Sequence, residues 1–175
     1  MLSERISKAI RDIPDFPKKG IIFKDIAPVL KDISLFSDII DFLVDKYKNS
    51  GITKIAAIES RGFLFGMPLA LKMNIPFVPI RKKGKLPGDV VEVSYDLEYG
   101  SASMEVQSDA ISSQDKVLIL DDLLATGGTA IAAAELVKKL KGAPTALAFI
   151  VELSFLKGRE NLKNSGIEVF SILTY

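Results

Sequence analysis

Residues 117–129, which read Val-Leu-Ile-Leu-Asp-Asp-Leu-Leu-Ala-Thr-Gly-Gly-Thr, constrain this chain more than any other segment. Four apolar residues typical of a buried strand end on Asp121 and Asp122, and an alanine-rich helical run follows from 130 to 140. Glycines at a helix N-terminus let backbone N–H groups approach a phosphate, and the helix dipole favours its negative charge. Carboxylates at the strand end can accept hydrogen bonds from sugar hydroxyls or help to hold Mg²⁺. The segment therefore predicts a sugar-phosphate site.

A Thr-Gly-Gly-Thr turn alone also suits an ordinary connection between a strand and a helix. The apolar strand and the acid pair before it favour the phosphate site. The segment is not a P-loop, because no Lys follows the glycines, and no G-x-G-x-x-G occurs in the chain.

Length and composition predict one soluble domain. The chain has 175 residues, of which 48% are hydrophobic and 26% charged, with a net charge of +1. This balance gives no reason to expect nucleic acid or an anionic membrane as a partner. Glu59, Arg61 and Lys72 interrupt the longest apolar region, so no transmembrane helix is expected. The N-terminus does not resemble a signal peptide, and we expect a cytoplasmic location.

Cysteine and histidine are both absent, which narrows the chemistry. Disulfides, thiolate nucleophiles, Ser-His-Asp mechanisms and His-ligated metals are excluded. Acid–base catalysis would have to come from Asp, Glu, Lys or Tyr, and a bound metal would be a hard, oxygen-liganded ion such as Mg²⁺.

Strands that alternate with helices predict a mostly parallel sheet covered by helices on both faces. We expect a single domain over 1–175 with a small N-terminal cap over 1–33. Helices are predicted over 3–13, from a cap at Ser34 up to Gly51, and over 62–72, 128–140 and 155–163. Strands are predicted at 54–58, 77–80, 117–121, 145–152 and 167–172, with an irregular segment over 14–33. Residues 82–90 read as a mobile loop, and 91–95 and 102–106 as an antiparallel ribbon.

Two further segments carry chemistry by their residue types. Glu59-Ser60-Arg61-Gly62 follows the strand at 54–58, and loops at the carboxyl ends of parallel strands share one edge of the sheet. Arg61 can then face the phosphate loop and bind a second phosphate bidentately, although it also reads as a solvated surface arginine. Residues 81–88 place four positive charges on a turn-rich loop. Such a loop is usually a solvated charge run, but it can also fold over a pyrophosphate and exclude water.

These motifs, in this order, resemble the type I phosphoribosyltransferases, and above all the members that use adenine. The resemblance spans about residues 10–160 and includes Glu-Ser-Arg-Gly-Phe, Arg-Lys-Lys-Gly-Lys-Leu-Pro-Gly and Asp-Asp-Leu-Leu-Ala-Thr-Gly-Gly-Thr. It implies that adenine and phosphoribosyl pyrophosphate (PRPP) give AMP and pyrophosphate, with Mg²⁺ bound through the substrate rather than by dedicated protein ligands. It also implies a homodimer and a lid over 81–106.

The resemblance assigns residues to four roles. Glu59, Ser60, Arg61, Arg81 and Lys85 would bind pyrophosphate, and the peptide bond within Glu59-Ser60-Arg61 is expected to be strained or cis. Phosphate and ribose binding falls to Asp121, Asp122, Ala125, Thr126, Gly127, Gly128 and Thr129.

The two remaining roles concern the base and the acid–base chemistry. Ile22 and Lys24 would read the adenine edge through their backbone, while Phe23 and Leu123 would enclose the ring. Glu98 would be the acid or base, with Tyr99 covering the substrates and with Arg61, Asp121 and Asp122 completing the catalytic set. Lys19 and residues 141–146 depart from the family pattern, and the second departure concerns packing more than catalysis.

Two alternatives remain open at this stage. The same scaffold can act on another base, such as hypoxanthine, guanine, xanthine or orotate. It can also serve as a regulator that binds PRPP without turnover. The near-neutral charge and the intact Glu98 segment count against the regulator.

Overall fold

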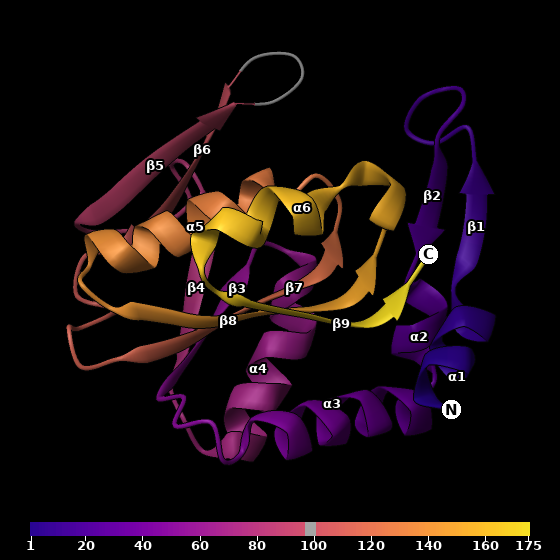
Figure 1. Cartoon of the computed structure of the whole chain (residues 1–175), viewed down its shortest axis with the longest axis horizontal. Coiled ribbons are helices and arrows are strands. Elements are labelled where there is room, and N and C mark those ends of the chain that lie inside the picture. The colour runs from indigo at the N-terminus through magenta and orange to yellow at the C-terminus, as the bar shows by residue number, and fades with distance from the viewer. Residues whose placement is uncertain (97–100) are drawn as a thin grey trace. The chain divides into compact units, whose positions relative to one another are not determined.

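The structure, a computed structural model, describes residues 1–96 and 101–175, and Figure 1 shows its elements. Two compact units divide the chain, Met1–Asp45 and Lys46–Tyr175. The first unit carries α1 (Leu2–Ala9), β1 (Arg11–Pro14), β2 (Ile22–Asp25), α2 (Ala27–Lys31) and most of α3 (Ile33–Tyr47). The second carries β3 (Lys54–Ile58), α4 (Arg61–Met73), β4 (Phe77–Lys82), β5 (Val90–Asp96), β6 (Ser101–Gln107), β7 (Lys116–Leu124), α5 (Gly128–Lys139), β8 (Ala143–Glu152), α6 (Gly158–Leu162) and β9 (Glu168–Thr174).

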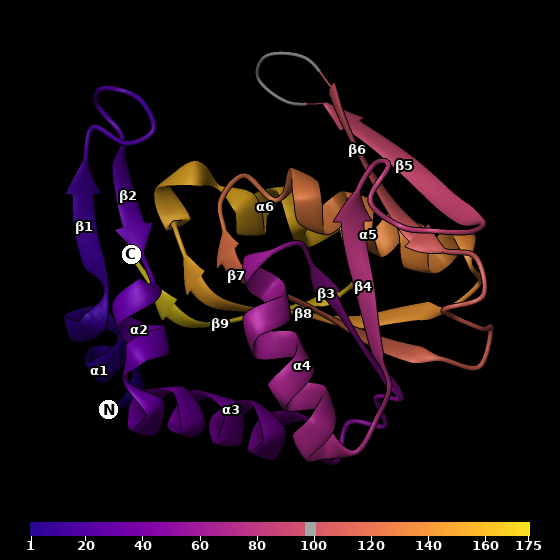
Figure 2. The ribbon, with the colours of Figure 1, turned by 180° about the vertical axis from the view of Figure 1, so that it is seen from behind.

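A mostly parallel sheet forms the second unit, as predicted. Within the described residues its strand order is β5-β6-β4-β3-β7-β8-β9. The strands from β4 through β3, β7 and β8 to β9 pair in parallel, whereas β6 and β5 add an antiparallel edge. Helix α4 covers one face, and α5 and α6 cover the other (Figures 1 and 2). The strands are nearly continuous apolar runs because both of their faces are buried.

Alternate residues of β3 build the two sides of this core. On one side, a Cβ added to Gly66 of α4 would lie 2.6 Å from the Cβ of Ala57, so glycine lets the helix approach closely. On the other side, Ala56 and Ile58 belong to a cluster that includes Ala133 of α5. The small side chains of α5 allow this helix to lie close to the sheet.

The N-terminal unit differs from the prediction. The helix predicted over 3–13 ends at Ala9, and residues 11–14 form β1, which pairs antiparallel with β2. The segment predicted to be irregular over 14–33 contains β2 and α2. Cross-strand ion pairs, Arg11 with Asp25 and Lys24 with Asp12, accompany this pairing, and sequence spacing alone does not reveal them.

Helix boundaries also shift at two other places. Asp32 rather than Ser34 caps α3, since its Oδ1 accepts the Leu35 N–H at 3.0 Å. The helix predicted over 155–163 is divided into a 3-10 turn (Ser154–Leu156), α6 and a second 3-10 turn (Lys163–Ser165). Lys157, in the left-handed region at φ 58°, separates the first turn from α6.

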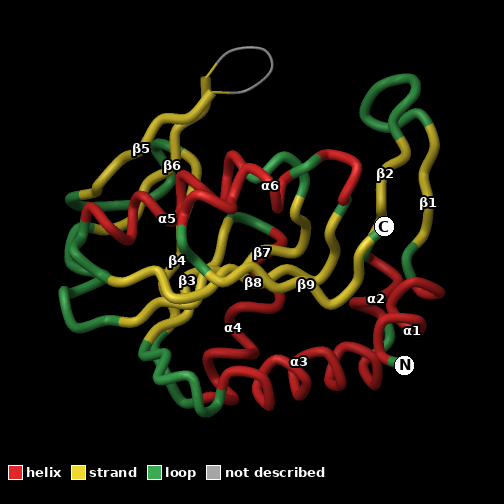
Figure 3. Tube along the Cα trace, in the orientation of Figure 1, coloured by secondary structure: helices red, strands yellow, loops and turns green. Residues whose placement is uncertain are grey.

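Strand β7 is longer than predicted, which changes the setting of the acid pair. The strand runs to Leu124 because its parallel partner β8 continues alongside, with Leu123 opposite Val151. Asp121 and Asp122 therefore lie within the strand rather than at its end. Figure 3 shows this stretch as strand, followed by the short loop that leads into α5.

The predicted antiparallel ribbon and the basic loop have a defined conformation. β5 and β6 pair with Tyr95 opposite Ala102. Glu105 of β6, which is buried, accepts the N–H groups of Lys85 and Leu86, both at 2.9 Å, and so holds the turn after β4. Movement of this segment stays a prediction. None of the helices in the part of the chain that the structure describes has the length and apolar character to cross a bilayer.

Candidate active site

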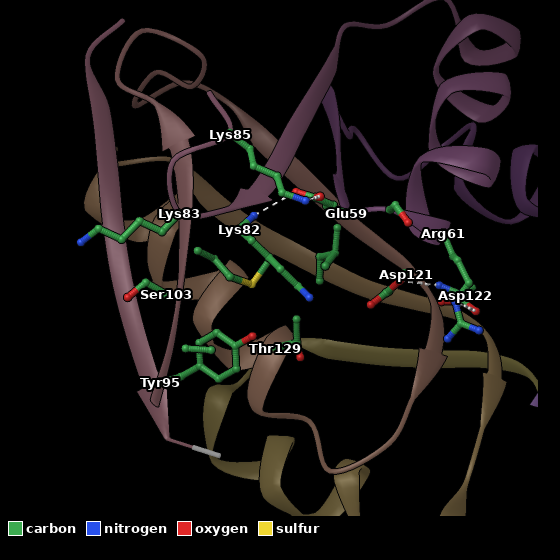
Figure 4. Close-up of a pocket in the computed structure, with 14 residues that line it drawn as sticks. Glu59, Arg61, Lys82, Lys83, Lys85, Tyr95, Ser103, Asp121, Asp122 and Thr129 are labelled. Carbon is green, nitrogen blue, oxygen red and sulfur yellow. Dashed lines mark hydrogen bonds and ion pairs between the residues drawn. The ribbon is translucent and has the colours of Figure 1, made fainter. Parts of the chain in front are cut away.

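A cleft of about 740 Å³ opens at the carboxyl ends of the central strands (Figure 4). Loops that follow parallel strands meet at this edge of a sheet, which is where ligands of such folds bind. The lining residues are Ile58, Glu59, Ser60, Arg61, Lys82, Lys83, Lys85, Tyr95, Ala102, Ser103, Met104, Asp121, Asp122 and Thr129. The cleft thus brings together the three sequence segments that were expected to face one another.

Glu59, directly after β3, binds the basic residues expected to contact pyrophosphate. Its Oε1 lies 2.5 Å from Lys85 Nζ and its Oε2 lies 3.2 Å from Arg81 Nε, and the Lys82 N–H donates to Oε2 at 3.0 Å. Burial acts to raise the pKa of Glu59, but the hydrogen bonds from Lys85, Lys82 and Arg81 outweigh it and lower this pKa to about 2. The carboxylate is therefore charged and fixes two cations at the rim of the cleft.

The Glu59–Ser60 peptide bond is cis, as the resemblance implied. Arg61 then opens α4 and points toward β7, where its Nε lies 3.1 Å from Oδ2 of Asp122 (Figure 4). The Asp122 side chain is only 4% exposed, and no hydrogen bond of good geometry reaches its Oδ2. The Arg61 ion pair is thus the compensation seen for that buried oxygen.

Asp121 and Asp122 together form an acid pair with too little compensating charge. Burial, followed by the neighbouring Asp122 charge, raises the pKa of Asp121 well above its usual value. Burial also raises the pKa of Asp122, against the opposing effect of Arg61. Two adjacent carboxylates in a buried setting favour ligands that bring hydrogen-bond donors or positive charge. Sugar hydroxyls have that property.

A smaller cup of about 50 Å³ lies at the loop between β7 and α5. Its lining residues are Asp121, Leu123, Leu124, Ala125, Thr126, Gly127, Thr129, Ala130 and Phe149. Gly127 has φ +88°, a left-handed conformation that suits glycine, and α5 begins at Gly128. The first N–H groups of a helix lack intrahelical acceptors and are available to an anion. Asp121 and Thr129 line both spaces, so the cup and the cleft adjoin.

Gly62 allows these parts to meet. A Cβ at this position would lie 2.8 Å from the backbone oxygen of Leu120 and 3.2 Å from Oδ1 of Asp121. Only glycine therefore lets the start of α4, with Arg61, approach β7 this closely. In the sequence, this residue is visible only as the Gly that follows Ser-Arg. Its role in the close approach of α4 to β7 depends on the register in which β3 pairs with β7.

Sequence reasoning missed Tyr95, Ser103 and Met104 as lining residues. Tyr95 and Ser103 lie on the paired strands β5 and β6, and Tyr95 also approaches the phosphate loop, since a Cβ on Gly128 would lie 3.7 Å from its ring. The alternation of side chains along a strand could have selected Tyr95 and Met104, which share one face of the ribbon, once the sheet edge was known, but it places Ser103 on the other face. Glu98 and Tyr99 lie outside the described residues.

The residues expected to bind the base fall in both units. In the N-terminal unit, Ile22 is exposed, the Phe23 ring packs edge-on against Phe16 at 5.1 Å, and Lys24 pairs with Asp12 at 2.8 Å. In the C-terminal unit, Leu123 lines the phosphate cup. Enclosure of a base ring by Phe23 and Leu123 stays a prediction.

Comparison with known proteins agrees with this geometry. Residues 29–172 match the family model of the phosphoribosyl transferase domain. The adenine phosphoribosyltransferase of Halothermothrix orenii is 55% identical over 96% of this chain and 98% of its own length. The crystal structure of adenine phosphoribosyltransferase from Thermoanaerobacter pseudethanolicus superposes with a TM-score of 0.95 at 48% identity, over 100% of both chains.

A further solved structure bears on the ligands. The Saccharomyces cerevisiae adenine phosphoribosyltransferase, complexed with adenine and an imino-altritol bisphosphate, has a TM-score of 0.91 at 41% identity over 98% of each chain. The chain belongs to the phosphoribosyltransferase family. Its relatives place it among the adenine phosphoribosyltransferases.

Proposed function

We propose that this enzyme transfers the phosphoribosyl group of PRPP to adenine and releases AMP and pyrophosphate. The observation that carries the proposal is the continuity of the cleft with the phosphate cup through Asp121 and Thr129. A single ligand lying along the cleft could therefore contact the phosphate site, then the acid pair, then the cationic rim. The relatives named for adenine supply the choice of base.

The donor would span the cleft with its two charged ends in separate sites. The 5′-phosphate would occupy the cup formed by 125–129, and Asp121 and Asp122 would accept hydrogen bonds from the ribose hydroxyls. Pyrophosphate would then lie near Ser60 and Arg61, with Arg81 and Lys85 at the rim. Glu59 is itself anionic, so its part in this set is to position those two cations.

Catalysis in this arrangement would rest on positioning and charge. Cations at the pyrophosphate end stabilise the leaving group as the glycosidic bond breaks, while the acid pair faces the positive charge that develops on the ribose. Adenine N9 would capture that ribose. Glu98 is proposed to exchange a proton with the base, and Tyr99 to cover the substrates.

The acid pair also suits the Mg²⁺ ion that the family uses with PRPP. Carboxylate oxygens are hard ligands, and the raised pKa of Asp121 and Asp122, which comes first from their burial, means that a cation beside them would favour their charged form. Across the described residues, no group of three or more Asp, Glu, His or Cys side chains gathers to hold a metal by itself. As the resemblance to the family implies, the donor's oxygens would supply most ligands, with Asp121 and Asp122 facing the ion. When bound, Mg²⁺ neutralises charge on the departing pyrophosphate.

The assembly and location follow the same proposal. Leu64, Met67 and Leu71, spaced three and four residues apart on α4, are exposed apolar side chains that a homodimer contact would cover. Leu71→Asp should then shift the sedimentation coefficient from dimer toward monomer. We also propose a cytoplasmic location, since PRPP is too highly charged to cross a membrane unaided.

A base panel tests the function directly. The purified protein is mixed with PRPP, Mg²⁺ and one of adenine, hypoxanthine, guanine, xanthine or orotate, and the nucleotide product is measured. AMP as the dominant product supports the proposal, and preference for another base overturns the adenine assignment. Binding of PRPP without release of pyrophosphate from any base would identify a sensor instead.

A further inference from the structure

The short helix α6 contacts the phosphate loop from outside the cup. Gly158, its first residue, lies so close to the loop that a Cβ there would be 2.2 Å from the backbone oxygen of Ala125. A Cβ on Gly127 would in turn lie 3.0 Å from the backbone oxygen of Gly158. Both glycines thus permit a close backbone-to-backbone contact between α6 and the loop: a Cβ at Gly158 would clash with the loop, and one at Gly127 would be tight and strained by the positive φ.

The next residue of α6 fixes the helix to the sheet. Arg159 donates from Nε to Glu152 Oε1 at 3.0 Å and from Nη1 to the backbone oxygen of Val169 at 2.6 Å. Glu152, at the end of β8, is buried, and the hydroxyl of Ser171 donates to its Oε2 at 2.7 Å. Charge-assisted bonds to two strands make α6 a fixed support rather than a loose surface turn.

Asn161, about one helical turn after Gly158, contacts the phosphate loop directly. Its Nδ2 donates to the backbone oxygen of Thr126 at 2.9 Å. A trans peptide is planar, with its C=O and N–H on opposite sides, so a Thr126 oxygen held toward Asn161 turns the Gly127 N–H away from α6. Gly158 lies against the Ala125 oxygen, which belongs to the same peptide as the Thr126 N–H. That N–H is therefore also turned away from α6.

We propose that Asn161 is a positioning residue for phosphate binding, with Gly158 and Arg159 as the supports that hold it in place. α6 thereby fixes the direction of two loop N–H donors before the 5′-phosphate arrives. This inference rests on the proposed function, because it assumes that the loop binds the phosphate of the ribosyl donor. Donors that are already oriented bind an anion without the cost of ordering the loop.

Asn161→Ala in the full-length protein tests the proposal by direct binding of two probes. Titrations with ribose 5-phosphate report on the phosphate loop, and titrations with inorganic pyrophosphate and Mg²⁺ report on the far end of the cleft. We expect the Kd for ribose 5-phosphate to rise about fivefold, as for loss of one neutral hydrogen bond. The Kd for pyrophosphate should stay at the wild-type value. In kinetics the KM for PRPP should rise while the KM for adenine is retained.

Asn164→Ala is the matched control, since Asn164 is an exposed asparagine three residues on, in the following 3-10 turn. It should leave both Kd values unchanged. Gly158→Ala should weaken ribose 5-phosphate binding more than Asn161→Ala, because its Cβ would displace the loop backbone. If Gly158→Ala does not fold, Asn161→Ala alone still decides the matter.

The outcomes separate the inference from the function beneath it. Wild-type ribose 5-phosphate affinity in Asn161→Ala overturns the positioning role, as does equal weakening of both probes, which indicates general loosening. If the wild-type protein binds ribose 5-phosphate and Thr129→Val weakens that binding while Asn161→Ala does not, only the inference fails. Failure of the wild-type protein to bind ribose 5-phosphate would instead remove the proposed function.

Discussion

The two ends of the cleft differ in their balance of cations and carboxylates and in the direction in which carboxyl pKa values are shifted. At the rim, Glu59 holds Arg81 and Lys85 in ion pairs, and its pKa is lowered to about 2. On β7, Asp121 and Asp122 lie side by side with their pKa values raised, and Arg61 is the cation paired with Asp122. The first region has two cations for one carboxylate, whereas the second has one cation, Arg61, for two carboxylates.

This difference shows how each end prepares for its part of the donor. The rim keeps its cations in place without substrate, so an arriving pyrophosphate finds them already oriented. The acid pair is held at a cost to stability, which hydroxyl donors and a cation would relieve on binding. Strain of that kind is typical of functional sites.

The largest effect should come from neutralising the acid pair. Asp121→Asn combined with Asp122→Asn should lower turnover by about 10²-fold or more, because the ribose loses its acceptors and the developing charge its stabilisation. The melting temperature should stay the same or rise, since the change removes two crowded carboxylates. Near-wild-type turnover with an intact fold would exclude these residues from the mechanism.

The difference in melting temperature between the double Asn variant and the wild type should change with pH in a definite direction. A carboxyl whose folded pKa is raised binds protons more tightly in the native state, so its contribution to stability is lost as pH rises through that pKa. The melting temperature of the double Asn variant should therefore exceed that of the wild type more at neutral pH than at acidic pH. The opposite trend in thermal scans across pH would contradict the raised pKa values.

Gly62→Ala should have the next largest effect because it moves the two regions relative to each other. Its Cβ would meet the Leu120 backbone oxygen at 2.8 Å and displace the start of α4, which carries Arg61. We expect turnover to fall by up to about 10²-fold, as for an ångström-scale misplacement, with a loss of about 1–3 kcal/mol in unfolding free energy. Gly128→Ala serves as a stability control, because its nearest neighbour is 3.7 Å away.

Glu59→Gln removes the anion that holds the two cations of the rim. Lys85 and Arg81 lose the carboxylate that positions them, and turnover should fall about tenfold, in line with loss of hydrogen bonds to a charged group. Since the pKa of Glu59 is lowered from 4.5 to about 2, its stabilising effect is present above pH 4.5 and is lost as pH falls toward 2. Thermal scans should show the wild type and the variant converging in that window.

Glu92→Gln should have the smallest effect and is the matched control for Glu59→Gln. Glu92 also pairs with a lysine of the lid, Lys83, at 2.9 Å, but that pair is solvent-exposed. Exposed ion pairs contribute little to stability, so turnover and melting temperature should both match the wild type. A loss equal to that of Glu59→Gln would show that any carboxylate near the lid has the same effect, and would remove the special role of Glu59.

Local patterns predicted the second unit better than the first. The strand at 54–58 matches the structure, and the helices around 62–72 and 128–140 differ by only one residue at an end. The helix over 3–13 was right up to Ala9 and wrong beyond it, because residues 11–14 form β1 and pair with β2, a contact between residues 8 to 14 positions apart that periodicity does not report. The same limit applies to the site. Tyr95 and Ser103 line the cleft only because β5 and β6 pair at the antiparallel edge of the sheet.

The sequence by itself determined the chemistry available at each turn: acids after an apolar run, glycines before a helix, and cations in a turn-rich loop. Those properties are local, because a few adjacent residues set backbone freedom and charge. Only the tertiary structure decided the partners, such as Glu59 with Lys85, Arg61 with Asp122, and Asn161 with Thr126. Strand register and helix packing bring these distant residues together, and hydrogen-bond geometry depends on distances that spacing along the chain does not encode.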